Sequence, residues 1–325
     1  MTAKDNTGTK RPLIILTGPT AVGKTALSIG LAKAIQGEII SADSMQVYRG
    51  MDIGTAKITK EQMDGVPHHL IDIMDPSDSF HVMAFQQKCK EAMEDIYARH
   101  KIPILVGGTG FYIQSVLYDI SFTETDTDIE YRQELQKIAE EQGGYVLHAR
   151  LAKIDPEAAD EIHPNNVKRV IRALEFNHQT GEKISIHNEQ ERQKKSPYQF
   201  RYYVLSLPRE ILYDRINRRV DMMRRDGLVD EVKGLLQQGI TPNMVSMQGL
   251  GYKETIDALQ GSCSFEEAFE RIKRETRHFA KRQFTWFRRE RDVTWIDKET
   301  YENEDAILQY MIEDLKNAYI LPADQ

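Results

Sequence analysis

The sequence predicts an α/β protein with a parallel sheet core and an α-helical insertion. Three observations support this prediction. Short apolar runs alternate with helix-length segments in the N-terminal third of the chain. A glycine-rich loop, residues 18–25, follows the first apolar run and opens a helix. Residues 119–196 then show helical patterns without strands. Together these features indicate a core like that of P-loop NTPases.

The N-terminal part supplies most of the predicted sheet. We expect strands at Pro12–Leu16, Glu38–Ser41, Leu70–Met74 and Ile102–Val106, and helices at Thr25–Ile35 and Phe80–His100. Strands separated by helices in this order favour parallel pairing.

The pattern changes after residue 118. The acidic segment Asp119–Asp128 leads into four predicted helices, followed by a polar segment, Asn188–Ser196, that we expect to be disordered. A strand at Arg201–Leu207 and further helices follow, with a last strand at Val293–Ile296. We therefore expect residues 1–118 and 197–325 to form one P-loop core, and residues 119–196 to form a helical insertion.

Composition narrows the class of protein. Of 325 residues, 40% are hydrophobic and 29% charged, the balance of a soluble globular protein, and we expect no membrane association. The two cysteines, Cys89 and Cys263, form no metal-binding pattern and indicate reduced thiols in the cytoplasm. The net charge of -7 argues against a nucleic-acid partner, but Arg271–Arg291 is strongly basic, and local patches decide such binding.

The strongest motif is the loop itself, which reads Gly18-Pro19-Thr20-Ala21-Val22-Gly23-Lys24-Thr25. In such a loop the backbone N–H groups surround phosphate oxygens, the lysine adds a positive charge, and the Thr25 hydroxyl is placed to bind Mg²⁺. A hydrolase would also have an apolar strand ending in a metal-binding Asp. Only Asp72 and Asp75 are weak candidates for it, so the loop predicts a diphosphate ligand without showing whether that diphosphate belongs to a nucleotide or is a leaving group.

Other polar residues follow predicted strand ends, where ligands of parallel sheets bind. Asp43 is either a general base near the loop or a turn-capping residue, and its position favours neither. Gly107–Gly110, with the Thr109 hydroxyl, is either a ligand contact or a tight turn. Arg215 and Arg219 share one helix face, which suits diphosphate but is also typical of a solvated surface.

Several motifs occur in an order that resembles the bacterial-type tRNA dimethylallyltransferases. Besides the P-loop and Gly107-Gly108-Thr109, the motifs are Asp43-Ser44-Met45-Gln46-Val47-Tyr48, Met51-Asp52-Ile53-Gly54-Thr55-Ala56-Lys57, Pro67-His68-His69-Leu70, Arg172-Ala173-Leu174-Glu175, Gly249-Leu250-Gly251-Tyr252 and Lys281-Arg282-Gln283. The resemblance covers nearly the whole chain. Eukaryotic relatives carry a C-terminal zinc finger that this sequence does not show.

This resemblance implies a prenyl transfer. Dimethylallyl diphosphate would bind the P-loop, and Mg²⁺, Lys24 and Arg219 would stabilise the departing pyrophosphate. Asp43 would accept a proton from the N6 amine of a flipped-out adenosine next to the tRNA anticodon, and Thr109 would lie at the reaction centre. The family's catalytic residues therefore correspond to Asp43, Thr109, Arg219 and Lys24.

The resemblance also implies tRNA contacts, with the insertion binding the anticodon stem-loop. The corresponding residues are Asp43, Ser44, Met45, Gln46, Thr109, Arg132, Lys168, Arg169, Val170, Ile171, Arg172, Gln248, Gly249, Leu250, Gly251, Tyr252 and Lys253. We expect the enzyme to be a monomer. Two other hypotheses use the same P-loop: a small-molecule kinase, and an RNA-binding module switched by a nucleotide.

Overall fold

The computed structural model describes residues 10–122 and 128–322. Its contacts divide the chain into two units, Met1–Leu117 with Pro197–Gln325, and Tyr118–Ser196. Half of the acidic segment Asp119–Asp128, residues 123–127, lies outside the described residues.

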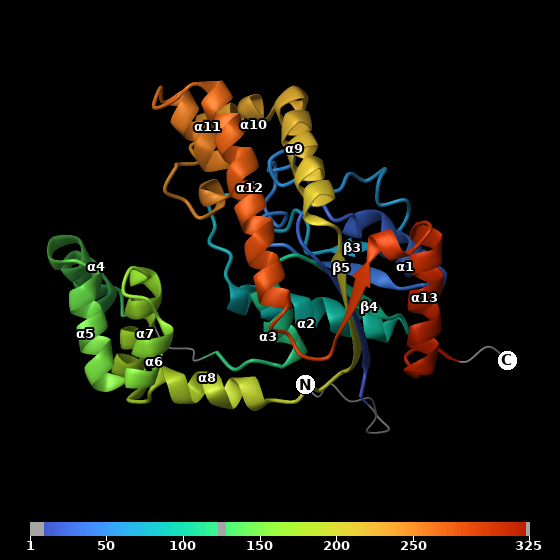
Figure 1. Cartoon of the computed structure of the whole chain (residues 1–325), viewed down its shortest axis with the longest axis horizontal. Coiled ribbons are helices and arrows are strands. Elements are labelled where there is room, and N and C mark those ends of the chain that lie inside the picture. The colour runs from blue at the N-terminus through green and yellow to red at the C-terminus, as the bar shows by residue number, and fades with distance from the viewer. Residues whose placement is uncertain (1–9, 123–127, 323–325) are drawn as a thin grey trace. The chain divides into compact units, whose positions relative to one another are not determined.

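Unit 1 is built on a parallel six-stranded sheet with the order β3-β2-β4-β1-β5-β6 (Figure 1). The strands are β1 (Pro12–Thr17), β2 (Glu38–Ala42), β3 (His68–His69), β4 (Pro103–Gly107), β5 (Gln199–Ser206) and β6 (Val293–Asp297). The central strand β1 pairs with β4 on one side and β5 on the other, which places Thr17 opposite Gly107. The predicted α/β class is confirmed.

Eight α-helices accompany the sheet within the described part of unit 1. They are α1 (Lys24–Ile35), α2 (Val82–Ala98), α3 (Gly110–Leu117), α9 (Arg209–Asp226), α10 (Leu228–Gln237), α11 (Tyr252–Leu259), α12 (Phe265–Phe287) and α13 (Glu304–Asn317). Ile14 and Leu16 of β1 pack in one core cluster with residues of α1 and α13, while the alternate residues Leu13 and Ile15 are equally buried. Because successive side chains of a strand point to opposite faces, the sheet has an apolar layer on both.

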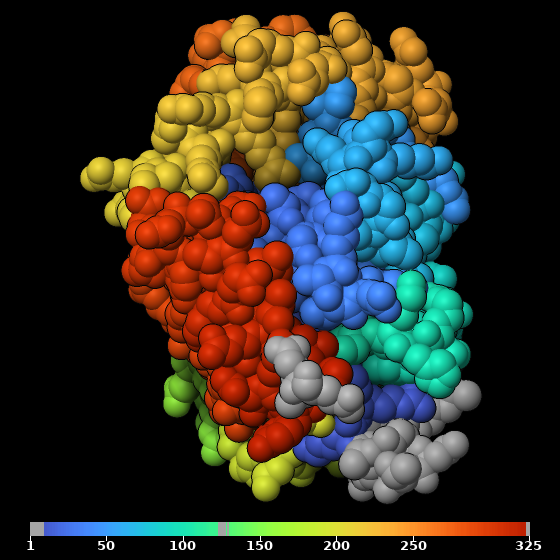
Figure 2. Space-filling view, turned by 90° about the vertical axis from the view of Figure 1, so that its right-hand side faces the viewer, coloured from blue at the N-terminus to red at the C-terminus, as the bar shows by residue number. Residues whose placement is uncertain are grey.

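The last elements of the chain complete the core begun by the first. In Figure 2, α13 and its neighbours, in red, lie beside the blue N-terminal segments. Contacts between α1 and α13 and the pairing of β1 with β5 give the same arrangement. Unit 1 is therefore assembled from both ends of the sequence.

Unit 2 is helical, with α4 (Ile129–Gln142), α5 (Gly144–Ile154), α6 (Pro156–Glu161), α7 (Val167–Thr180) and α8 (Ile184–Gln193). Its own core contains Leu135, Leu147, Leu151, Val170 and Leu174, contributed by α4, α5 and α7. In the described ranges of both units, no helix combines the length and apolar character needed to cross a membrane.

Two local predictions were wrong. Leu70–Met74 is not a strand, because Leu70 and Asp72 adopt left-handed backbone conformations, with φ of 62° and 55°. The neighbouring strand β3 is limited to His68 and His69. The segment Asn188–Ser196, expected to be disordered, is helical as far as Gln193, where α8 ends.

Candidate active site

The P-loop connects the end of β1 to the start of α1. Gly18 and Gly23 have φ of 144° and 97°, values that residues with a side chain rarely adopt. The Lys24 amine crosses the loop and donates hydrogen bonds to the carbonyl oxygens of Gly18 and Pro19, at 2.9 and 3.0 Å. The loop therefore has a formed backbone, and its lysine is held by carbonyl groups.

The charges beside this loop are mostly positive. The pKa of Lys24 is lowered to about 8, mainly by burial and in addition by the nearby Arg219, while Asp43 acts in the opposite direction. Burial likewise lowers the pKa of Arg219, and Asp43 again opposes the shift. A bound anion would relieve both desolvated cations, because opposite charge favours their protonated forms. The electrostatics therefore match a diphosphate.

Arg219 reaches the loop from α9. Its guanidinium donates to the Thr20 hydroxyl and to the Ala56 carbonyl, each at 3.5 Å. These long contacts leave it loosely held, although its side chain is largely enclosed.

A further cation at the loop, Lys298, was missed by the sequence analysis. A Cβ added to Gly23 would lie 2.7 Å from the Lys298 amine and 3.6 Å from the Arg215 guanidinium. Lys298 pairs with Glu304 at 2.6 Å. Its position directly after β6 was the available signal, since the ends of parallel strands meet at one sheet edge.

Asp43 comes directly after β2, at the same edge. Its Oδ1 accepts hydrogen bonds from the backbone N–H groups of Met45, at 2.9 Å, and Gln46, at 3.3 Å. Among the described residues, its other carboxylate oxygen accepts no hydrogen bond. The turn-capping hypothesis and the site hypothesis are thus compatible, because one oxygen serves the turn while the carboxylate influences both cations.

The loop after β4 lies beside the P-loop because α12 joins the two. The buried Gln283 amide accepts from the Thr20 N–H and donates to the Gly108 carbonyl, both at 2.9 Å. Thr109 begins the turn into α3, and its N–H donates to the Ala42 carbonyl at 3.2 Å. The structure therefore brings Thr109, Asp43 and the P-loop together. Gln283 belongs to a motif identified in the sequence, but only the structure shows this bridging contact.

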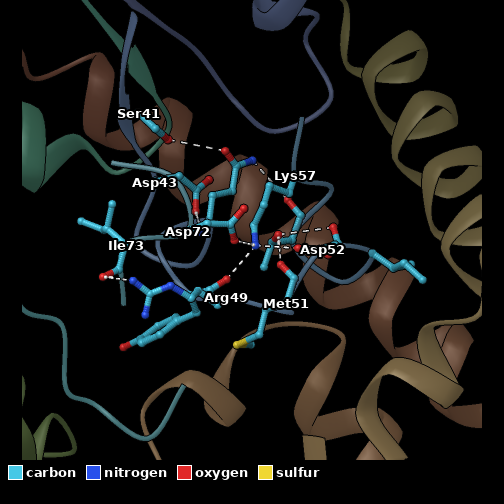
Figure 3. Close-up of polar contacts among 12 residues, drawn as sticks. Ser41, Asp43, Arg49, Met51, Asp52, Lys57, Asp72 and Ile73 are labelled. Atoms are coloured by element: carbon cyan, nitrogen blue, oxygen red, sulfur yellow. Dashed lines mark hydrogen bonds and ion pairs between the residues drawn. The ribbon is translucent and has the colours of Figure 1, made fainter. Parts of the chain in front are cut away.

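A second polar cluster lies near Asp43 (Figure 3). The buried Lys57 amine contacts the Tyr48 carbonyl and Asp52, each at 2.6 Å, and Asp72, at 2.5 Å. Asp72, the weak candidate for a metal-binding aspartate, is therefore an ion-pair partner of Lys57. In the described parts of the chain, no group of three acidic, His or Cys side chains is arranged to hold a metal ion. The exposed Thr25 hydroxyl at the start of α1 suits a cation that takes its other ligands from diphosphate and water.

The predicted RNA-contacting segments of unit 1 lie next to each other. A Cβ added to Gly249 would lie 2.6 Å from the Met45 side chain. Gln248 and Lys253 are exposed, whereas Tyr252 is buried and donates its hydroxyl to Glu231 at 2.7 Å. The segment 248–253 therefore exposes two polar side chains and is held in place by the hydroxyl of Tyr252.

The corresponding residues of unit 2 divide into two groups. Lys168, Arg169 and Arg172 are exposed along α7, whereas Val170 and Ile171 belong to the core of the unit. The side chains of these two residues therefore pack inward.

Arg132 is already paired within unit 2. Its guanidinium makes a two-pronged ion pair with the buried Glu175, at 2.5 and 2.8 Å, which raises the pKa of the arginine. About 44% of its side chain is exposed, so it retains a free surface.

The fold and this site define a protein of the P-loop class, with a site suited to a diphosphate. Comparison with known proteins is more specific. The model of the IPP transferase family matches residues 46–290, and that of the isopentenyl transferases matches residues 12–79. The chain belongs to the IPP transferase family, whose members are prenyltransferase enzymes.

Relatives resemble the chain over nearly its whole length. A tRNA dimethylallyltransferase of Lachnoclostridium phytofermentans is 57% identical, covering 96% of this chain and 99% of its own. The solved tRNA isopentenylpyrophosphate transferase of Bacillus halodurans is 47% identical, with a TM-score of 0.71 and coverage of 96% and 99%. A eukaryotic dimethylallyltransferase acting on tRNA has a TM-score of 0.79 at 31% identity, covering 97% of this chain and 81% of the other. The P-loop class predicted from sequence is confirmed.

Proposed function

We propose that the protein transfers the dimethylallyl group of dimethylallyl diphosphate to the N6 amine of the adenosine 3′ to the anticodon in tRNA. The products are N6-isopentenyladenosine and pyrophosphate. The observation that carries this proposal is the P-loop with two desolvated cations, Lys24 and Arg219, beside the carboxylate of Asp43. The matching family and the names of the relatives support the same reaction.

The reaction breaks the bond between the allylic carbon and the diphosphate oxygen and forms a bond from that carbon to N6. Lys24 and Arg219 stabilise the negative charge that develops on the leaving diphosphate. Positive charge develops on the allylic carbon. Because the adenine amine is a weak nucleophile, a group that orients it and accepts its proton accelerates attack.

Asp43 is suited to take that proton. Its Oδ1 is fixed by two backbone N–H groups, so the carboxylate has a defined direction. Thr109, on the neighbouring strand end, is the residue we place beside the amine. The target base leaves the anticodon stack to reach them, as in other enzymes that modify bases.

A divalent cation fits this chemistry, and we propose Mg²⁺. Thr25 would hold it together with diphosphate oxygens and water, and the ion would supply further charge stabilisation for the leaving group. The absence of three clustered ligands from the described residues agrees with an ion bound largely by substrate.

The exposed basic residues of α7 and the segment 248–253 are the surfaces that we propose for tRNA. The helical unit, which we placed at residues 119–196 from the sequence, would bind the anticodon stem-loop. Since tRNA is the acceptor, the proposal includes a cytoplasmic location, and we propose that the enzyme acts as a monomer. Binding through Lys168, Arg169 and Arg172 should weaken with added salt.

The decisive experiment incubates unmodified tRNA with dimethylallyl diphosphate and Mg²⁺, followed by mass analysis of the nucleosides. We expect one isopentenyladenosine per accepted tRNA, with release of pyrophosphate. A parallel reaction with ATP and no prenyl donor tests the kinase hypothesis. Unchanged adenosine in the first reaction, or phosphoryl transfer in the second, would refute the proposal.

A further inference from the structure

The loop of residues 51–57 has a conformation that its surroundings must hold. Ala56 adopts a left-handed backbone with φ of 46°, which is uncommon for a residue with a side chain. The Ala56 N–H donates to the Ile53 carbonyl, at 3.0 Å, and the Lys57 N–H to the Asp52 carbonyl, at 2.9 Å. These bonds close the loop on itself and turn several N–H groups outward.

The Glu231 carboxylate, on α10, accepts hydrogen bonds from those N–H groups. Its Oε2 accepts from the N–H groups of Asp52, at 2.9 Å, and Ile53, at 2.7 Å, and its Oε1 accepts from Gly54 at 3.1 Å. The Tyr252 hydroxyl donates to the same Oε1 at 2.7 Å. Four donors thus converge on one carboxylate, and hydrogen bonds to an ionised group are the stronger kind.

The other side of the loop faces the candidate active site. The Ala56 carbonyl accepts from the Arg219 guanidinium and from the Gln46 amide, each at 3.5 Å. The same amide donates to the Thr55 carbonyl at 3.3 Å, and the Gln46 N–H donates to Asp43. Figure 3 shows this loop beside Asp43. The loop therefore supplies one of the two hydrogen-bond partners of Arg219 among the described residues.

We propose that Glu231 is a positioning residue for prenyl transfer: it fixes loop 51–57, and the loop in turn holds Arg219 at the P-loop. Arg219 makes only two hydrogen bonds within the described chain, both long, so a shift of the Ala56 carbonyl removes one of its two anchors. This inference rests on the proposed function, in which Arg219 stabilises the departing pyrophosphate. It assigns Glu231 a role in turnover and none in contacting either substrate.

The substitution Glu231→Gln tests the idea with little change in size. A glutamine has one acceptor oxygen, and its NH₂ group would face either the Gly54 N–H or the pair of N–H groups at Asp52 and Ile53. At one of these two places the NH₂ donor then faces an N–H donor instead of an acceptor, and this repulsion displaces the loop. We expect the transfer rate at saturating substrates to fall about tenfold, with tRNA affinity unchanged within about twofold.

Asp230→Asn is the matched control, since Asp230 precedes Glu231 on α10 and 84% of its side chain is exposed. Its transfer rate should equal that of the wild type. If Glu231→Gln accumulates poorly, Tyr252→Phe tests the same contact by removing one donor while leaving the three N–H bonds. We expect it to slow transfer about threefold.

The decisive comparison combines Glu231→Gln with Arg219→Ala. If Glu231 acts through Arg219, the double variant should be as slow as Arg219→Ala alone, because the anchored group is already missing. A further tenfold loss in the double variant, or a full rate for Glu231→Gln, would overturn the inference. The wild-type control separates the two proposals, because a wild type that does not transfer the prenyl group refutes the function itself.

Discussion

The two ends of strand β2 differ in whether their buried charged side chains are paired. At the start of the strand, the buried Glu38 carboxylate accepts hydrogen bonds from Arg99, Lys101 and His69, with shortest distances of 2.7, 3.0 and 2.8 Å. Just after the other end, Asp43 lies near Lys24 and Arg219. Neither of these cations forms a salt bridge with a carboxylate among the described residues.

The pKa values express the same difference. Burial alone would raise the pKa of Glu38, but the bonds from its three partners overcome that effect and lower the pKa to about 2. At the P-loop, burial lowers the pKa of Lys24 to about 8. One end is therefore neutralised within the protein and contributes to stability, whereas the two cations at the other end have no salt-bridge partner among the described residues and would be stabilised by a bound anion.

The largest effect that would separate the two ends is on catalysis at Asp43. In Asp43→Asn, the remaining Oδ1 still accepts from the Met45 and Gln46 N–H groups, so the turn is preserved while the proton acceptor is lost. We expect the single-turnover transfer rate to fall about a thousandfold. Donor affinity should change by no more than about threefold. A near-normal rate would remove Asp43 from proton transfer and leave it only its turn-capping role.

The second effect should appear in stability at the opposite end. Glu38→Gln breaks a buried ion cluster, and since Arg99 and Lys101 are partly exposed and can be rehydrated, we expect a loss of about 2 kcal/mol in the free energy of unfolding. The transfer rate should remain that of the wild type. Urea unfolding measures the first quantity and single-turnover kinetics the second.

The pH dependence of this stability has a defined sign. Because the pKa of Glu38 is lowered from 4.5 to about 2, its contribution is fully present above pH 4.5 and disappears as the pH falls toward 2.

Glu91→Gln is the control for Glu38→Gln, since Glu91 is exposed and bonds only to Gln87 among the described residues. It should change the free energy of unfolding by less than about 0.5 kcal/mol. An equal loss in both variants would show that the cluster at Glu38 has no special role.

Some residues of the candidate site could be predicted from the sequence, and others could not. The P-loop, Asp43 and Thr109 follow strands in the sequence, and the geometry of a parallel sheet alone brings such positions to one edge. Gln283 lies far from both loops that it joins, so no local pattern reveals its contacts. Lys298 follows a strand too, but a single lysine after a strand is not distinctive.

The wrong predictions have local physical causes. The Leu70–Met74 run is apolar enough to suggest a strand, yet two left-handed residues prevent an extended backbone. Helix α8 has no buried residue among its members, so it lacks the apolar period by which helices are recognised. In both segments the hydrophobic pattern of the sequence does not indicate the backbone conformation.

The smallest expected effect concerns the protonation of Lys24 at the P-loop. Because the pKa of Lys24 is about 8, the free enzyme loses this proton above that pH, while bound diphosphate favours the protonated form. Donor binding should therefore weaken as the pH rises, by about tenfold between pH 7 and pH 9. Calorimetry in buffers of different ionisation enthalpy should detect proton uptake on binding at pH 9 and little at pH 6.5. Lys24→Met should bind more weakly at every pH and lose this slope. If wild-type affinity is constant from pH 7 to pH 9, then Lys24 is not a desolvated cation that a bound diphosphate reprotonates, and the two ends of β2 differ less than their geometry indicates.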